Sequence, residues 1–96
     1  MSRREYKISI VVNDQRYSKV IIDPHYEEKH ADYMTDELIL ELVKTLDGEE
    51  HEARGERPPY SYFEKDRIKV GEKFYKLVWL FEEDQIYVGV VNAYRR

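Results

Sequence analysis

Two histidines in the first third of the chain, His25 and His30, are the side chains best suited to proton transfer, because an unperturbed imidazole titrates near neutral pH. Metal-free cleavage of RNA needs a base for the 2′-hydroxyl proton, an acid for the leaving oxygen and cations on the phosphate. Tyr94 can donate a proton or stack on a base, and Arg67 can hold a phosphate. The candidate catalytic residues are therefore His25, His30, Arg67 and Tyr94.

Further basic side chains lie on predicted strands or at the C-terminus, where they could bind the phosphates of a nucleic acid. A structural interpretation stays open for both groups. A histidine on a short helix is more often a surface residue, and alternating basic residues are typically the solvated face of a strand. The candidate nucleic-acid-binding residues are Lys69, Lys76, Arg95 and Arg96.

Other chemistries have little support in the sequence. His25 and His30 are five residues apart, about 140° around a helix, so they would not chelate one metal ion together. His51 lies in an acidic tract that we expect to be a solvated loop. The chain has no cysteine, no glycine-rich phosphate loop and no serine in a glycine-flanked turn. We therefore expect no metal site and no cofactor.

Length and composition predict one domain spanning residues 1–96. The apolar runs are too short to span a bilayer, so a cytoplasmic protein is the default expectation. The net charge of −4 disfavours general nucleic-acid binding, but it is unevenly spread. Residues 23–56 hold twelve acidic against three basic residues, whereas residues 57–81 hold six basic against three acidic. This segregation allows a local surface for an anionic ligand.

The N-terminal half predicts a hairpin followed by two helices. Residues 5–12 and 17–22 alternate as strands around a turn at residues 13–16. Asp23 and Pro24 start a short helix that ends near Met34. Thr35 opens a second helix whose apolar residues follow the helical period. Residues 49–59 are expected to form a loop.

The last forty residues predict an antiparallel meander of strands at 60–70, 73–81 and 86–93. Both faces of 73–81 are apolar, which predicts a central strand covered on both sides. Gly89 marks a bulge or a close approach. The predicted fold is α+β with the order ββααβββ, a mainly antiparallel sheet and two helices packed on one face.

Two segments carry a resemblance to a known family. Residues 23–30, followed by 34–37 at the start of an amphipathic helix, resemble the helical part of BrnT-like toxins. Residues 86–96 resemble the last strand of those toxins, which finishes in a small residue followed by basic ones. BrnT-like toxins belong to the broad RelE-like ribonuclease superfamily, which cleaves RNA without a metal. The resemblance covers roughly residues 20–96 and implies roles for His25 or His30 and for Tyr94, Arg95 and Arg96.

Two hypotheses follow. The first is a metal-independent endoribonuclease toxin of a toxin–antitoxin pair, associated with the ribosome, with RNA as substrate and an antitoxin protein as partner. The second is a non-catalytic protein-binding or homodimer-forming module of the same fold, which associates through an exposed sheet edge or an aromatic patch. Composition favours the second hypothesis, and the resemblance favours the first.

Overall fold

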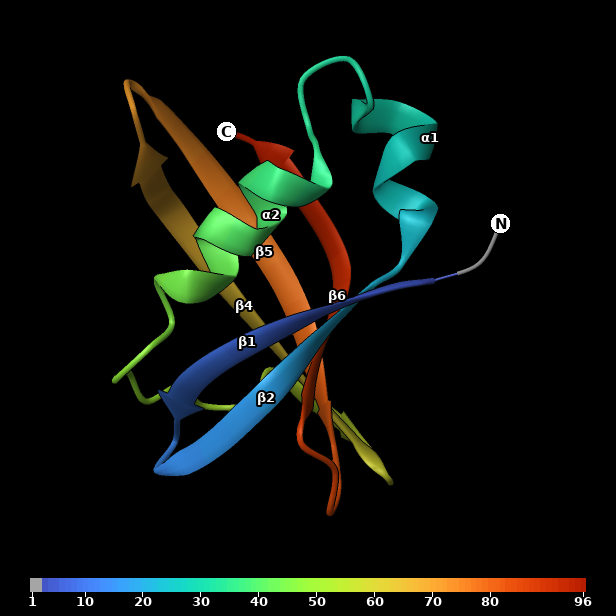
Figure 1. Ribbon diagram of the computed structural model, residues 1–96, viewed down its shortest axis with the longest axis vertical. Coiled ribbons are helices and arrows are strands. Elements are labelled where there is room, and N and C mark those ends of the chain that lie inside the picture. The colour runs from blue at the N-terminus through green and yellow to red at the C-terminus, as the bar shows by residue number, and fades with distance from the viewer. Residues whose placement is uncertain (1–2) are drawn as a thin grey trace.

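The computed structural model describes residues 3–96 as a six-stranded sheet with short helices (Figure 1). Its α+β class and its C-terminal antiparallel meander confirm the prediction from sequence. No helix in the described part of the chain is long and apolar enough to cross a membrane. The elements are β1 (Arg4–Val12), β2 (Gln15–Ile22), the 3₁₀ helix η1 (Pro24–Tyr26), α1 (Glu27–His30), α2 (Asp36–Lys44), β3 (Gly55–Arg57), β4 (Tyr60–Val70), β5 (Lys73–Glu82) and β6 (Tyr87–Arg95).

The strands lie in the order β1-β2-β6-β5-β4-β3. All neighbours are antiparallel except β2 and β6, which run parallel because the helical segment carries the chain away from β2 before the meander begins. The loop predicted at 49–59 is wrong in one part, since Gly55–Arg57 pairs with the start of β4 as the edge strand β3. The short, polar β3 carries no hydrophobic alternation that would have revealed it.

Local signals explain how the N-terminal hairpin and α2 begin. Asn13 and Asp14 both adopt positive φ, at 54° and 62°, as a two-residue hairpin turn requires, and asparagine and aspartate tolerate this conformation best after glycine. The hydroxyl of Thr35 accepts a hydrogen bond from the Leu38 N–H at 3.1 Å and caps α2, as expected. The first predicted helix is instead split into η1 and a four-residue α1.

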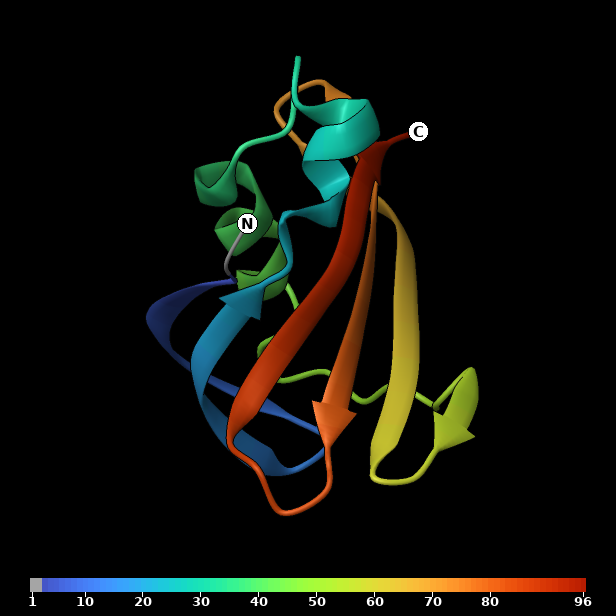
Figure 2. The ribbon, with the colours of Figure 1, turned by 90° about the vertical axis from the view of Figure 1, so that its right-hand side faces the viewer.

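The core lies between α2 and the face of the sheet that bears the buried side chains of β4, β5 and β6, and the curved β1–β2 hairpin closes one side of it (Figures 1 and 2). β5 is central, as predicted, and Leu77 and Trp79 on its helix side are fully buried. The predicted cover on the second face is wrong. Val78 and Leu80 are only half-buried there, and no element of residues 3–96 packs over them.

Candidate functional site

A pocket of about 300 Å³ opens where η1 and α1 meet the C-terminal half of β6. It is lined by His25, Lys29, His30, Asn92 and Tyr94. Three of the four residues predicted to be catalytic therefore share one pocket, although they come from two ends of the chain. His25 lies on η1 and His30 is the last residue of α1, and both line the opening.

His30 is held by contacts on two sides. Its ring lies against that of Tyr94, with the centroids 5.5 Å apart and an interplanar angle of 27°. Its Nδ1 is 3.0 Å from the hydroxyl of Tyr33, which also accepts the backbone N–H of Arg95 at 3.0 Å. Because Nδ1 is occupied in this way, Nε2 is the ring nitrogen left for exchange with a ligand.

His25 has a carboxylate partner. Its Nδ1 lies 2.5 Å from Oε2 of Glu28, one helical turn further along. A carboxylate only accepts hydrogen bonds, so Nδ1 carries a proton, and Nε2 is the unprotonated nitrogen in the neutral form of the ring. The two histidines are thus oriented by different partners.

Lys76 is the predicted phosphate-binding residue that lies beside this pocket. It pairs with Tyr94 across β5 and β6, and its ammonium is 3.3 Å from Glu64. The hydrogen bond with Glu64 raises the pKa of Lys76 against the opposing effect of burial, and the neighbouring Tyr94 hydroxyl raises it further. Lys76 therefore stays cationic beside Tyr94.

None of the other predicted basic residues lines this pocket. The guanidinium of Arg95 covers the Tyr33 ring at 4.5 Å, on the helix side of β6. Arg96 forms an ion pair with Asp66 at 2.9 Å. Arg67 occupies a β4 bulge with φ of 55°, and Lys69 sits 6.0 Å above the ring of Phe74. Arg67 is thus not brought together with the histidines, because β5 separates β4 from β6.

Sequence reasoning missed a polar cluster around Asp36 that joins β1 to the helices. The Asp36 carboxylate accepts hydrogen bonds from the Arg4 guanidinium at 2.5 and 2.9 Å and from the hydroxyls of Tyr6 and Tyr26. Arg4 also reaches Glu27 at 2.9 Å. The Arg4 hydrogen bonds lower the pKa of Asp36 to about 2, which outweighs the effect of burial. Asp36 is the first residue of α2, and nothing in the sequence indicates that its carboxylate also bonds to β1 and η1.

The acidic tract around His51 is exposed at Glu50 and Glu52, as expected, but His51 itself is not solvated. Its side chain is 18% exposed, and its Nε2 lies 2.9 Å from Glu49, which also binds the ammonium of Lys65 at 2.9 Å. Burial tends to raise the pKa of Glu49, but the hydrogen bonds from Lys65 and His51 outweigh it, and the pKa is lowered. The His51 ring also lies at right angles to that of Trp79, with centroids 5.1 Å apart. The acidic tract around His51 does not indicate, from sequence alone, that Lys65 on β4 is its partner.

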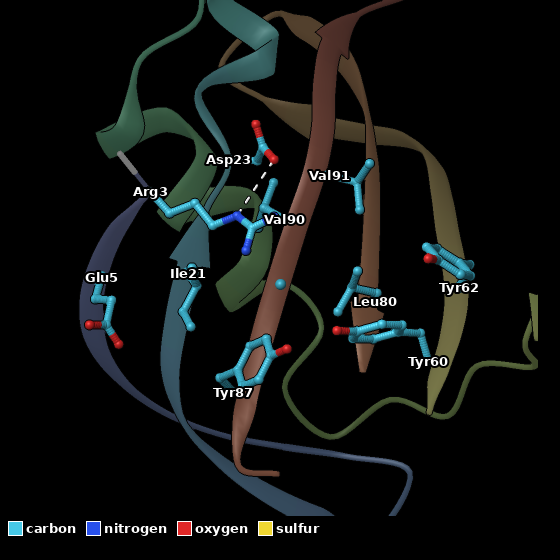
Figure 3. A pocket seen from close by; sticks show the side chains of 11 residues that line it. Arg3, Glu5, Ile21, Asp23, Tyr60, Tyr62, Leu80, Tyr87, Val90 and Val91 are labelled. Atoms are coloured by element: carbon cyan, nitrogen blue, oxygen red, sulfur yellow. Dashed lines mark ion pairs between the residues drawn. The ribbon is translucent and has the colours of Figure 1, made fainter. Parts of the chain in front are cut away.

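A larger pocket, of about 460 Å³, lies on the helix-free face of the sheet (Figure 3). Its floor is formed where Leu80 faces Gly89 across β5 and β6. A Cβ on Gly89 would lie 2.7 Å from Cδ1 of Leu80, so this close approach explains the glycine, as predicted. We call this site the tyrosine pocket and define it by Tyr60, Tyr62, Leu80, Tyr87, Gly89 and Val91.

Comparison with protein-family models, with curated proteins and with solved structures finds no match to this chain. Among residues 3–96, no group of three or more His, Asp or Glu side chains is arranged to hold a metal ion.

Proposed function

We propose that this protein is an endoribonuclease that cleaves RNA without a metal ion, with its active site in the pocket between α1 and β6. The observation that carries the proposal is that His25, His30 and Tyr94 line that pocket together. The resemblance of residues 23–30 and 86–96 to BrnT-like toxins concerns the same segments. The geometry and the resemblance therefore support one site.

His25 is the general base of the proposed reaction. Glu28 holds Nδ1 as the protonated nitrogen, so the lone pair on Nε2 is free to accept the proton of the 2′-hydroxyl. The resulting oxyanion attacks the adjacent phosphorus and forms a 2′,3′-cyclic phosphate. Glu28 also stabilises the imidazolium that His25 becomes.

His30 is the general acid. In its protonated form Nδ1–H donates to the Tyr33 hydroxyl, and Nε2–H is the proton given to the departing 5′-oxygen. The second lone pair of the Tyr33 oxygen accepts the Arg95 N–H, so Tyr33 ties the acid to the end of β6. Tyr33 is a positioning residue in this scheme, since it acts through His30.

The phosphate is held by groups on the pocket wall. Lys29 and Asn92 line the pocket, and Lys76 stays cationic beside Tyr94. An ammonium and an amide can donate to the non-bridging oxygens as charge develops on them. One face of the Tyr94 ring lies against His30, and Tyr94 contributes to the lining of the pocket from the β6 side.

Incubating the purified protein with RNA in EDTA tests the proposal. We expect fragments ending in 2′,3′-cyclic phosphates, and a loss of at least about a hundredfold in rate for the His25→Ala/His30→Ala double variant. His51→Ala serves as the matched control, because it removes a histidine outside the pocket. Expression in a bacterial host should arrest growth for the wild type and not for the double variant. Cleavage that survives in the double variant, or that needs an added metal, would contradict the proposal.

A further inference from the structure

The tyrosine pocket has the composition of a binding site that the proposed reaction does not use. Tyr60, Tyr62 and Tyr87 are half-buried around a floor of Leu80 and Gly89, and Ile21 on β2 extends the apolar lining (Figure 3). The face is covered by no element among residues 3–96. Half-buried tyrosines over an aliphatic floor offer contact area at low entropic cost, as in protein-binding surfaces.

The charged side chains next to the tyrosine pocket indicate which class of ligand it would bind. Tyr60 also lines a neighbouring hollow of about 440 Å³ at the end of the sheet, where the side chains of Glu56, Glu82, Glu83 and Asp84 gather without a lysine or arginine among its lining residues. Within the described chain, no cation lies within 4 Å of the Glu56, Glu83 or Asp84 carboxylates.

The charged side chains that line the tyrosine pocket itself are already paired. Arg3 is 3.7 Å from Asp23, and Glu5 is 3.7 Å from Lys19. Glu82 accepts the hydroxyl of Tyr87 at 2.6 Å. Arg54 and Arg57 line a further hollow at β3, which shares Tyr62 with the tyrosine pocket and Glu56 with the neighbouring acidic hollow.

We propose that the tyrosine pocket binds a basic segment of a partner protein, with arginine or lysine stems lying on Tyr60 and Leu80 and their charged ends reaching the carboxylates of the neighbouring hollow. A guanidinium stacks on a tyrosine ring and pairs with two carboxylate oxygens at once, so an arginine satisfies both surfaces. Single-stranded RNA could stack on the same rings, but its phosphates would face four carboxylates. The inference does not depend on the proposed ribonuclease activity.

The test uses a fluorescein-labelled peptide of alternating arginine and leucine residues, followed by fluorescence anisotropy. We expect Tyr60→Ala to weaken binding about tenfold, and Glu83→Gln/Asp84→Asn to do so by a similar factor. The second variant lies on an exposed turn, where asparagine tolerates the positive φ of Asp84, so it tests the site without touching the core. A peptide with glutamate in place of arginine should not bind.

Matched controls separate the site from general attraction between opposite charges. Glu50→Gln/Glu52→Gln removes the same charge from another exposed loop, and Phe74→Ala removes an exposed aromatic ring at the start of β5, far from Leu80 on that strand. Both should bind within about twofold of the wild type.

Three results would overturn the inference. The first is absent peptide binding, or equal binding by Tyr60→Ala and the wild type. The second is tighter, Tyr60-dependent binding of a 2′-O-methyl RNA, which cannot be cleaved by 2′-oxygen attack and so reports binding alone. The third is self-association in sedimentation that Glu83→Gln/Asp84→Asn abolishes, because the occupant would then be a second copy of the chain. None of these results bears on cleavage by His25 and His30.

Discussion

The ring of His30 lies on that of Tyr94, with centroids 5.5 Å apart, and joins the end of α1 to the last strand of the sheet. The two residues are 64 positions apart in the sequence. Their contact makes one wall of the proposed active site out of a short helix that has little stability of its own, since four residues form barely one helical turn. The site therefore depends on how firmly the helical segment is anchored.

Tyr33→Phe tests that anchoring. The change removes the hydroxyl that contacts His30 Nδ1 and accepts the Arg95 N–H. We expect kcat for RNA cleavage to fall about tenfold with little change in KM, and the free energy of unfolding to fall by about 1 kcal/mol. Tyr62→Phe is the control, because Tyr62 lines the tyrosine pocket and not the pocket that holds His30. An unchanged kcat in Tyr33→Phe would show that the Tyr33 hydroxyl does not position His30 for catalysis.

Asp36→Asn tests the cluster that holds β1 against the helices. The folded carboxyl has a pKa of about 2 against an unperturbed 3.8, so its stabilisation is complete above about pH 4 and is lost as the pH falls towards 2. That difference corresponds to about 2 kcal/mol, and the Asn variant should lose this amount at pH 7. Its unfolding free energy should also vary less between pH 4 and pH 2. Urea unfolding across this range measures both effects. Glu37→Gln, the next residue of α2, should behave as the wild type, and equal acid sensitivity in Asp36→Asn would refute the assignment.

Gly89→Ala tests the close packing under the tyrosine pocket. The new methyl group would lie 2.7 Å from Cδ1 and 3.0 Å from Cγ of Leu80. We expect a loss of about 1–3 kcal/mol in unfolding free energy, because neither strand can move apart within the sheet. Leu80→Ala should relieve part of that loss when combined with Gly89→Ala, which a double-mutant cycle would detect. Gly55→Ala is the control, since a Cβ there meets nothing within 4 Å.

Glu49→Gln tests the ion pair beneath α2. The carboxylate binds Lys65 and His51 through the same oxygen, and the neutral amide removes the negative charge from both interactions. We expect a loss of about 1 kcal/mol at neutral pH, since the pair is partly exposed. The pKa of Glu49 is lowered in the fold, so the difference between variant and wild type should shrink as the pH falls through the titration of this carboxyl. A difference that stays constant down to pH 2 would show that it does not come from the charge of Glu49, which would contradict the assignment of the ion pair.

The fold was predictable where local pattern and tertiary structure agree. The alternation in β4 to β6 and the Thr35 cap predicted the meander and α2 directly. The sequence did not reveal β3, because three exposed residues pair with β4 without any hydrophobic period.

The candidate site was predictable in its residue types and only partly in its geometry. His25, His30 and Tyr94 meet because β6 runs parallel to β2, a pairing between distant segments that no local signal specifies. Arg67 was expected nearby, but strand order places it beyond β5. The outer face of β5 is apolar, which predicted that another element covers it. Its half-buried Val78 and Leu80 instead belong to an open face.

A change of leaving group separates the roles of His25 and His30. An RNA whose scissile 5′-oxygen is replaced by sulfur needs no acid, because a thiolate leaves unprotonated. With this substrate in EDTA, His30→Ala should recover to near the wild-type rate, while His25→Ala should stay at least about a hundredfold slower because the 2′-hydroxyl still needs a base. A His30→Ala variant that the sulfur substrate does not rescue, or rescue of both variants alike, would contradict the assignment of His25 as base and His30 as acid.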